Sequence, residues 1–485
     1  MTGYEIAPFY KFGGMGDVMG SLPKALKEVS VDCRVVIPYY QEIREKFKER
    51  KIGEFFVHFG ESEEEVSVYE GYFGSDRVVI YFLSNRPNLS HIKTHGRNKK
   101  IDQFAFFDLA LAHFILWLKK HTGWTPSLVH CNDWHTALIP LILKKQVKLP
   151  IPTLLTIHNL SYQGWGSREV LNLLHLQDED VKELKKNLPA TEINVLGEGI
   201  MHATRVSTVS KTYAQEISHP NHKLISKYIQ KRESSGTDGK ITGILNGIDY
   251  GVWDPTSDPF ITREFDRSNW KINKRKNKED LLKKFNLPNL PVFCFVGRIT
   301  TQKGLNIIVK TAKKLIDLDI NIIILGSGEP NIEKSVKKIE NRYPSNIKTI
   351  FSYNEELAHK IYAGSDFILI PSHFEPCGLI QMIAMRYGTL PIASNTGGLK
   401  DSIKNNSTGF LFEKDKTRPF IKAVKKALMV YKDSQRPSTK LVRGKYEIMV
   451  KRAMNTDFTW KKSAKKYKKL YLDIVSNSHF NNNGA

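Results

Sequence analysis

Short runs of apolar residues alternate with longer amphipathic segments along most of the chain. Short apolar runs bounded by turn residues are typical of buried strands, and the longer segments have the length and spacing of helices. This alternation predicts an α/β fold with helices packed on parallel sheets. The predicted strands are 33–39, 78–83, 128–131, 153–158, 292–297, 320–326, 348–353 and 367–372.

The segment 234–284 differs from the rest of the chain, because a turn-rich stretch is followed by a polar, mostly basic one. We expect two α/β domains joined near residues 236–248, with a strand at 242–245 opening the second. A length of 485 residues fits two to three domains. The predicted parts are an N-terminal domain (1–240), a C-terminal domain (241–456), a helix (457–477) and a frayed tail (478–485).

The most hydrophobic stretch is Leu109–Leu118, which includes His113. It is shorter than the ~18 residues of a membrane-spanning helix, so we expect a buried core helix and no membrane partner. The first residues lack the basic and apolar regions of a signal peptide. The four cysteines are scattered without a C-x-x-C motif, which favours a reducing, cytoplasmic compartment.

The chain has 73 Lys and Arg against 50 Asp and Glu, a net charge of +23 at pH 7. Such a surplus suits an anionic partner such as a nucleic acid, a membrane surface or a nucleotide. The alternative, which we prefer, is a set of lysines spread over solvated faces. That interpretation predicts no specific nucleic-acid partner.

A glycine-rich turn at 11–17, KFGGMGD, precedes a helix that we expect to begin near Asp17. Glycines allow close backbone approach, and a helix start presents N–H groups to an anion. Lys11 adds a cation there. The spacing does not match G-x-G-x-x-G, and no P-loop motif occurs in the chain. A purely structural turn is an equal alternative.

Polar residues also follow two strands of the first half. The segment 130–135, HCNDWH, lacks the H-E-x-x-H or paired-cysteine pattern of a zinc site, and its composition suits a polyhydroxylated ligand. The alternative places Asp133 at a helix N-cap and Trp134 in the core. His158, after the next strand, is either a ligand contact or a core histidine.

In the second half, Arg298 and Lys303 lie in one loop after a buried strand. A guanidinium fork and a lysine point charge together suit a diphosphate. The segment 326–329, GSGE, follows the next strand in the same way.

The loop 372–379, SHFEPCGL, lies between a strand and an amphipathic helix. Its backbone N–H groups near Cys377 suit a phosphate, and Glu375 suits sugar hydroxyls. Cys377 fits a packing role better than a nucleophilic one, because no base is evident nearby.

In combination these motifs resemble those of glycosyltransferase family 5, the bacterial glycogen synthases and plant starch synthases. The resemblance runs from about Glu5 to Tyr471, with the motifs in order. They are KFGGMGDV (11–18), HCNDWHTALIP (130–140), TIHNLSYQG (156–164), ILNGIDYGVWDP (244–255), GRITTQKG (297–304), FEPCGL (374–379) and NTGGLKDS (395–402).

The resemblance implies a GT-B fold, in which two Rossmann-like domains face a deep cleft and a last helix crosses back to the first domain. It also implies transfer of glucose from ADP-glucose to the non-reducing end of an α-1,4-glucan, with retained anomeric configuration and no metal or other cofactor. Fixed cations can neutralise the departing diphosphate. Double displacement and same-face attack both remain open as routes to retention, since no carboxylate stands out as the nucleophile.

Residue roles also follow from the resemblance. Arg298 and Lys303 would hold the diphosphate, and His158 would face the reacting carbon. Glu375 would bind the donor glucose, together with the main chain of Cys377, Gly378 and Leu379. Asp133 and Asn246 would bind glucose hydroxyls, and Tyr353 would stack on the adenine. The residues that would contact phosphate, sugar or acceptor are Lys11, Gly14 and Asp17.

The chain departs from the family pattern at two places. Where the family has a complete first strand, this chain has only Met1-Thr2-Gly3-Tyr4. Either the gene starts late or the first strand is stunted, and the order of the Lys11 loop depends on this strand. The second acid of the superfamily's E-x7-E pair is replaced by Ile383, with Gln381 nearby, which we interpret as subfamily character.

Two rival functions stay open on the sequence. One is a GT-B glycosyltransferase with another donor or acceptor. The other is a catalytically silent glucan- or nucleic-acid-binding protein, which the segment 431–470 favours with 13 Lys and Arg against three acids. The presence of Arg298, Lys303 and Glu375 together favours an active transferase.

Overall fold

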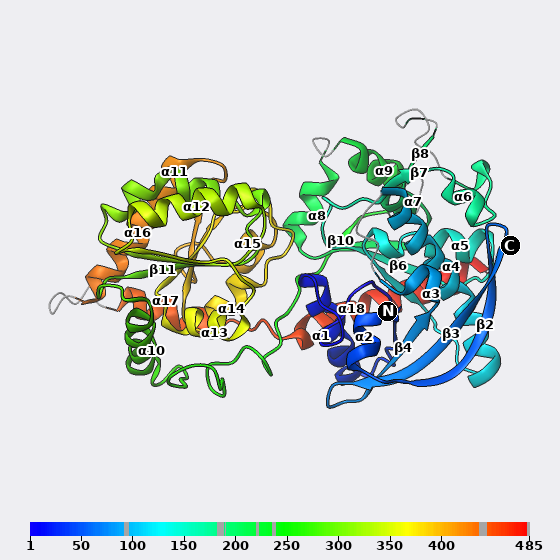
Figure 1. Ribbon diagram of the computed structural model, residues 1–485, viewed down its shortest axis with the longest axis horizontal. Coiled ribbons are helices and arrows are strands. Elements are labelled where there is room, and N and C mark those ends of the chain that lie inside the picture. The colour runs from blue at the N-terminus through cyan, green and yellow to red at the C-terminus, as the bar shows by residue number, and fades with distance from the viewer. Residues whose placement is uncertain are drawn as a thin grey trace. The chain divides into compact units, whose positions relative to one another are not determined.

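The computed structural model describes residues 1–91, 97–181, 189, 191–219, 223–234, 239–435 and 444–482. The chain forms two compact units (Figure 1). Unit 1 consists of 1–246 and 460–485, and unit 2 of 247–459. The first boundary lies after residue 246 rather than at the expected 240, and the last helix belongs to unit 1.

Unit 2 is built on a six-stranded, fully parallel sheet in the order β13-β12-β11-β14-β15-β16. The four strands predicted for this half all occur, whereas β15 and β16 were not predicted. Counted from β11, the order is 3-2-1-4-5-6, that of a dinucleotide-binding fold with its switch point between β11 and β14. The strands are β11 (Val292–Val296), β12 (Asn321–Leu325), β13 (Ile347–Ile350), β14 (Phe367–Ile370), β15 (Leu390–Ser394) and β16 (Phe410–Phe412).

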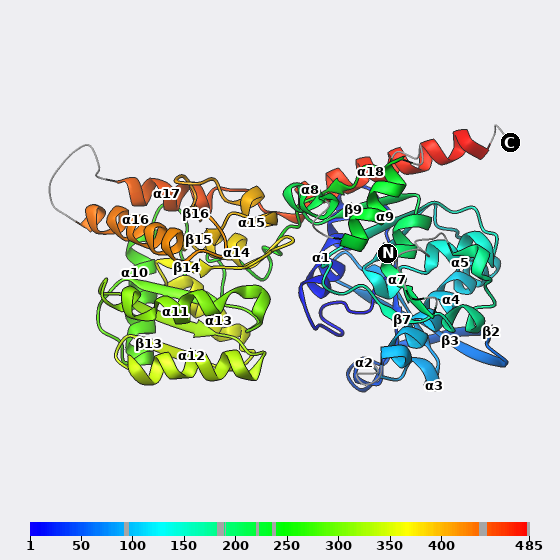
Figure 2. The ribbon, with the colours of Figure 1, turned by 90° about the horizontal axis from the view of Figure 1, so that it is seen from above.

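Helices cover both faces of this sheet. Figure 1 shows α11 and α12 on one face and α13 and α14 on the other, and Figure 2 shows α16 beside α17. Both faces are covered, so the central strands are apolar throughout, which is why the sequence shows them as continuous apolar runs. The helices are α10 (Trp270–Phe285), α11 (Leu305–Ile316), α12 (Pro330–Arg342), α13 (Glu355–Gly364), α14 (Ile380–Arg386), α15 (Gly397–Ser402), α16 (Thr417–Gln435) and α17 (Lys445–Met454).

Unit 1 has two four-stranded segments of sheet, β10-β9-β6-β5 and β1-β4-β3-β2. All pairs are parallel except those of β3 with β2 and with β4. A small antiparallel pair, β7 with β8, lies apart from them. The strands are β1 (Val35–Pro38), β2 (Arg50–Phe59), β3 (Ser62–Phe73), β4 (Val78–Ser84), β5 (Val129–Asn132), β6 (Thr153–Ile157), β7 (Trp165–Ser167), β8 (Glu192–Asn194), β9 (Arg205–Thr208) and β10 (Thr242–Gly243).

The first two residues join the segments. Thr2 forms parallel bridges to Cys131 of β5 and Val36 of β1, and its N–H donates to the carbonyl of His130 at 2.9 Å. The first strand is therefore stunted to a bridge at Thr2, next to which the Met1 carbonyl accepts the N–H of Val36 at 2.9 Å. With this bridge as strand 1, the strands from β4 to β9 again follow the order 3-2-1-4-5-6, with the switch point between Thr2 and β5.

Two strand predictions for unit 1 were wrong. The strand expected to open the second domain is β10, which pairs with β9 and completes the sheet of unit 1. The expectation of parallel sheets alone missed the antiparallel β2 and β3. These strands have one solvated face, so charged and apolar residues alternate along them and no continuous apolar run marks them.

The helices of unit 1 include one very apolar helix, α4. Its window Lys100–Thr122 is long and apolar enough to cross a membrane, so the expectation that no segment approaches that length was wrong, but 78% of the window is buried inside the structure. Phe104, Phe106 and Phe107 are almost completely buried in the main core cluster, so α4 is the predicted core helix. The helices are α1 (Gly14–Glu28), α2 (Gln41–Lys46), α3 (Arg86–Leu89), α4 (Arg97–Thr122), α5 (Ile139–Lys145), α6 (Val170–Leu173), α7 (Val195–His202), α8 (Lys211–Ser218), α9 (Lys223–Ser234) and α18 (Trp460–Asn482).

The last helix packs its apolar side on α1, where Tyr467 and Ile474 join a cluster with Leu22 and Leu26. It ends at Asn482, so the end expected at residue 477 was too early. The helix continues through the polar residues after 475, where the Ser478 hydroxyl donates to the carbonyl of Ile474 at 2.8 Å.

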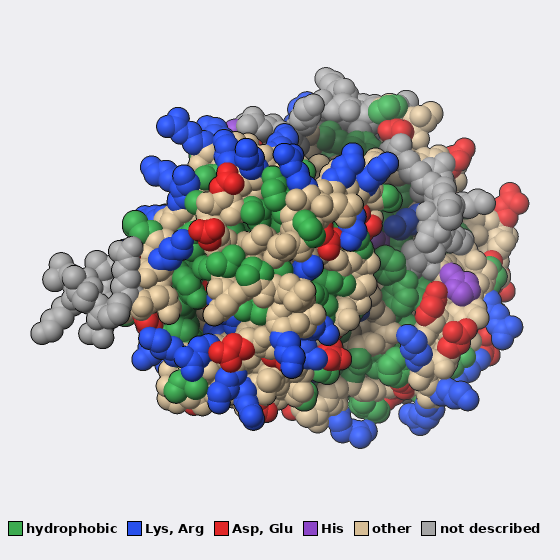
Figure 3. Space-filling model, turned by 60° about the vertical axis from the view of Figure 1, so that its left-hand side comes forward, with side chains coloured by type: hydrophobic (Ala, Val, Ile, Leu, Met, Phe, Trp, Pro, Cys, Tyr) green, Lys and Arg blue, Asp and Glu red, His purple; other side chains and the backbone are tan. Residues whose placement is uncertain are grey.

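The surplus charge is distributed over the visible surface. Figure 3 shows Lys and Arg side chains spread across the face in view, with Asp and Glu between them. This distribution agrees with the interpretation that many lysines cover solvated faces.

Candidate active site

In unit 2 the predicted site residues follow the two strands at the switch point. Arg298 and Lys303 come after β11, and Glu375 comes after β14, its direct neighbour in the sheet. Carboxyl ends of adjacent parallel strands meet at one edge, where ligands bind in folds of this topology. The structure therefore brings these three residues to one loop cluster of unit 2.

A buried ion pair joins the two loops. The Lys303 ammonium lies 2.6 Å from Oε2 of Glu375, and the two side chains are only 14% and 6% exposed. The Ser372 hydroxyl donates to the same carboxylate oxygen at 3.1 Å. The amide of Gln302 donates to the carbonyl of Phe374 at 3.2 Å. The carboxylate and the ammonium are thus held in fixed positions, as a preorganised polar site requires.

The backbone of the loop after β11 requires glycine at residue 304. Gly304 has φ +70°, and a Cβ there would lie 1.9 Å from the carbonyl oxygen of Pro371. Arg298, in contrast, is exposed, and the space beside Gly297 is open, since a Cβ there would have no neighbour within 4 Å. A ligand can therefore approach the loop at its beginning.

The segment 326–329 supports this loop. The carboxylate of Glu329 accepts bonds from the N–H and the hydroxyl of Thr301, at 2.8 and 2.9 Å, and these bonds lower its pKa. The N–H of Ile299 donates to the carbonyl of Ser327 at 2.9 Å. Glu329 thus fixes the backbone between Arg298 and Lys303.

The loop after Glu375 is also fixed. The buried side chain of Gln381 donates to the carbonyls of Cys377 and Gly378, at 3.0 and 2.8 Å. Gly378 has φ +73°, which favours glycine. Leu379 caps the following helix α14, whose Ile383 is buried, so the position of the superfamily's second acid lies in the apolar core.

Tyr353 lies beyond β13, two strands from β11, and its side chain is 74% exposed. Its hydroxyl donates to the carboxylate of Glu355 at 2.7 Å. An exposed ring of this kind offers a flat face on which an aromatic base can stack.

In unit 1 the glycine-rich turn starts α1 at Gly14, three residues before the helix start expected near Asp17. Lys11 and Asp17 form an ion pair of 2.7 Å. A Cβ at Gly14 would meet nothing within 4 Å, so open space adjoins this position. The Lys11, Gly14 and Asp17 predicted as one site therefore do lie together.

The sequence did not identify Glu5 as part of this turn. Its buried carboxylate accepts hydrogen bonds from the N–H groups of Phe12, Gly13 and Gly16, the Gly13 bond being 2.8 Å long. Burial raises the pKa of Glu5. Glu5 therefore already occupies three of the N–H groups near the helix start that we expected from the sequence to face an anion. The signal in the sequence was an acid just after the short first strand.

Asp133 follows β5 with φ +58°, a strained value for a residue other than glycine. Its carboxylate accepts the N–H of His158 at 2.7 Å, and it makes no side-chain cap bond to the following helix. Asp133 thus occupies the N-cap position of the short 3-10 helix Trp134–Thr136, as the alternative expected, but its side chain does not cap that helix. Trp134 is in the core, as that alternative also expected. Burial raises the pKa of Asp133 to about 7, with Glu5 adding to the effect.

His158 is partly exposed, and its Nε2 lies 2.9 Å from Oδ1 of Asn132. Burial lowers the pKa of His158 to about 3, so the ring is neutral at physiological pH. Asn246, at the end of unit 1, is buried, and its Oδ1 has no hydrogen-bond partner among the described residues. An unpaired buried oxygen of this kind suits a ligand hydroxyl.

Over the ranges that the structure describes, no group of three or more His, Cys, Asp or Glu side chains is arranged to hold a metal ion. His130, which lies in the motif considered for zinc, instead contacts the hydroxyls of Tyr471 and Thr156, at 2.8 and 2.6 Å.

Comparison with known proteins agrees with this geometry. A model of the starch synthase catalytic domain matches residues 1–230, and one of glycosyl transferases group 1 matches 277–440. The chain is 35% identical to the glycogen synthase of Thermodesulfovibrio yellowstonii, over 97% of this chain and 96% of that one. The chain belongs to the glycogen and starch synthase family. It is therefore a glycosyltransferase.

Solved structures support the same family. The catalytic domain of starch synthase IV from Arabidopsis thaliana, bound to ADP and acarbose, matches with a TM-score of 0.86 and 29% identity, covering 98% of both chains. Sucrose-phosphate synthase from Thermosynechococcus elongatus matches at a TM-score of 0.59 and 16% identity, covering 96% of this chain and 94% of that one, which shows a shared fold alone. The fold is that of the GT-B glycosyltransferases.

Proposed function

We propose that the protein transfers glucose from ADP-glucose to the non-reducing end of an α-1,4-glucan, releases ADP and retains the anomeric configuration. The observation that carries the proposal is the buried Lys303–Glu375 pair at the switch point of unit 2, beside the exposed Arg298. The relative bound to ADP and acarbose supports a nucleotide donor and a glucan acceptor.

The proposed role of the cations is to bind the diphosphate. Breaking the bond between glucose and phosphate places negative charge on the departing ADP. Arg298 can contact the phosphate oxygens with two N–H groups, while Lys303 supplies a point charge. These contacts strengthen as the charge develops, so they lower the barrier to transfer. Tyr353 is assigned to the adenine, because its ring is exposed.

The proposed role of Glu375 is to bind the donor glucose, with the main chain of Cys377, Gly378 and Leu379. The carboxylate already accepts bonds from Lys303 and Ser372, which orient it before substrate arrives.

Unit 1 supplies the other proposed sugar contacts. Asp133 and Asn246 are assigned to glucose hydroxyls, and Lys11, Gly14 and Asp17 to phosphate, sugar or acceptor. His158 is assigned to the reacting carbon. Its neutral ring can accept or donate a hydrogen bond there without adding charge next to the cationic sugar.

We further propose that the reaction needs no metal or other cofactor, since Arg298 and Lys303 can supply the positive charge that a metal would provide. We also propose that the enzyme works in the cytoplasm. The four cysteines, Cys33, Cys131, Cys294 and Cys377, are all free, as is usual in a reducing compartment.

The test is incorporation of labelled glucose into glycogen from ADP-glucose, run in parallel with UDP-glucose. Clear preference for ADP-glucose is the expected result. Transfer from UDP-glucose alone would indicate a different donor. Absence of transfer from either donor, with glycogen still bound, would instead indicate the silent binding protein.

A further inference from the structure

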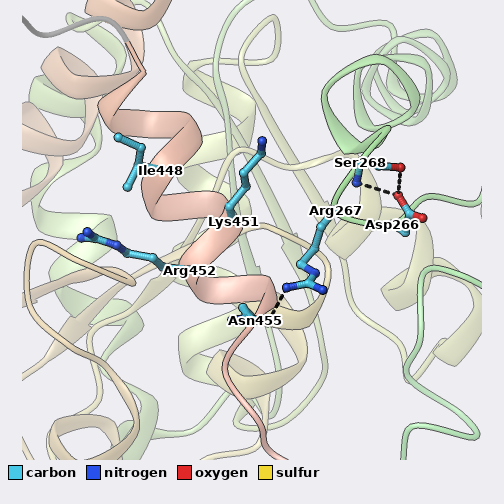
Figure 4. A pocket seen from close by; sticks show the side chains of 7 residues that line it. All are labelled: Asp266, Arg267, Ser268, Ile448, Lys451, Arg452 and Asn455. Atoms are coloured by element: carbon cyan, nitrogen blue, oxygen red, sulfur yellow. Dashed lines mark hydrogen bonds between the residues drawn. The ribbon is translucent and has the colours of Figure 1, made fainter.

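A hollow of about 610 Å³ in unit 2 contains none of the proposed active-site residues (Figure 4). It lies between α17 and the turn that precedes α10. Its volume falls in the range of about 300–1,000 Å³ typical of small-molecule sites. The lining residues are Asp266, Arg267, Ser268, Ile448, Lys451, Arg452 and Asn455.

One face of α17 forms a wall of this hollow. Residues 448, 451, 452 and 455 are spaced three, one and three positions apart, which places them on the same side of a helix. Ile448 is 49% exposed and gives this wall an apolar patch.

Two cations line this part of the hollow, Lys451 on α17 and Arg267 in the turn before α10. The guanidinium of Arg267 donates to Oδ1 of Asn455 at 2.5 Å, which orients it, and Lys451 has no ion pair or side-chain hydrogen bond within the described ranges. Figure 4 shows Lys451 at the edge of this helix face that lies toward Arg267, and Ile448 and Arg452 at its opposite edge.

One acid, Asp266, lies among three cations in the lining, Arg267, Lys451 and Arg452, so positive charge is in excess there. Hydrogen bonds from Ser268 lower the pKa of Asp266, which therefore keeps its negative charge. One carboxylate oxygen of Asp266 accepts bonds from the N–H and the hydroxyl of Ser268, at 2.7 and 2.6 Å. Glu447, on α17, lies 3.0 Å from the ammonium of Lys271. The hollow therefore carries a positive field that favours an anion.

We propose that this hollow binds a phosphate group carried on a small organic molecule. Arg267 contacts the phosphate oxygens with two N–H groups, Lys451 adds a point charge, and Ile448 packs against the carrier. The alternative is that Lys451 and Arg452 serve only to stabilise the last turn of α17 through its dipole.

The test uses the full chain with saturating ADP, which fills the proposed donor site. Inorganic phosphate, glucose 6-phosphate and glucose are each titrated by calorimetry. We expect glucose 6-phosphate to bind more tightly than phosphate, and glucose not at all. Arg267→Gln and Lys451→Gln should each weaken binding about tenfold, which corresponds to the loss of one charge-assisted contact.

Lys425→Gln is the matched control, because it removes one exposed cation from α16 of the same unit. It should leave binding unchanged, and all three variants should retain glucose transfer. Equal loss in Lys425→Gln, or unchanged binding in the double variant of Arg267 and Lys451, would overturn the site. Equal affinity for phosphate and glucose 6-phosphate would overturn the organic carrier. Binding is measured directly, so a failure of the proposed transferase activity would be seen separately.

Discussion

Replacing Glu375 tests the centre of the proposed mechanism. Glu375→Gln keeps the size of the side chain and its contact with Ser372 but removes the charge that faces Lys303. The change therefore has two expected effects, one on the stability of unit 2 and one on turnover, and the two can be measured separately.

The effect on stability follows from burial of the pair. Removing one partner of a buried ion pair costs about 3–5 kcal/mol, because the other charge stays buried without compensation. Lys303 is still 14% exposed, so we expect the lower end, about 3 kcal/mol. For a unit of this size, about 2–4 °C per kcal/mol gives a fall in Tm of about 6–12 °C.

The effect on turnover should be larger than the change in stability can explain. Loss of one fixed polar group that stabilises the transition state lowers kcat by about 10²–10³. The assay is glucose incorporation into glycogen from ADP-glucose, at a temperature well below the Tm of the variant. Glu375→Ala should lose at least as much while the protein stays folded.

The double variant Lys303→Met with Glu375→Gln is the control. Removal of both charges leaves no uncompensated ion, so its Tm should return toward that of the unaltered chain. Its turnover should stay low. Near-normal kcat in Glu375→Gln, or recovery of turnover together with Tm in the double variant, would refute the assignment.

The remaining predictions concern other parts of both units. Arg298→Ala should lower kcat/KM for ADP-glucose about 10–100-fold through loss of a charge-assisted contact, with EDTA having little effect, and a strict need for Mg²⁺ or Mn²⁺ would contradict this. Gly14→Ala should leave the Tm unchanged but lower kcat/KM for the donor, because the new Cβ would enter open space. Gly304→Ala should lower the Tm, because its Cβ would collide with the backbone at Pro371. A thermal melt and a measurement of kcat/KM for both variants test this. Between about pH 4 and 7 the folded protein binds a proton at Asp133 that the unfolded chain does not bind, so the contribution of Asp133 to stability falls as the pH rises. Asp133→Asn should therefore raise the Tm at pH 8 and leave it unchanged near pH 4. An equal change in Tm at both pH values would contradict the raised pKa. Duplex DNA retained at 50 mM salt should be released near 200 mM, while glucose transfer persists; salt-resistant DNA binding without transfer would overturn the enzyme assignment.

The patterns that predicted the fold well were those of buried parallel strands. Each of the eight predicted runs contains a strand, because a strand covered on both faces must be apolar throughout. The strands β2 and β3 were missed because one of their faces is solvated. The end of α18 was misplaced because the polar composition after residue 475 predicted fraying, whereas the helix continues through it.

The candidate site, like the fold, could be predicted from the sequence only in part. The sequence identified Arg298, Lys303 and Glu375 as polar residues just after strands, since a loop at the carboxyl end of a parallel strand is where chemistry gathers. It could not show that Lys303 and Glu375 form a buried pair, because that contact joins loops 72 residues apart. It also missed Glu5, whose role depends on the backbone of the turn beside it.

The sequence by itself determined the alternation of strands and helices, the positions of the glycine turns and the membership of a family, since these depend on local pattern and residue order. The tertiary structure alone decided which strands are neighbours, that Thr2 bridges β5 and β1, and that the Asp133 carboxylate bonds the N–H of His158 and not the helix that Asp133 precedes. Strand order and hydrogen-bond partners depend on contacts between residues distant in sequence, and no local pattern encodes those contacts.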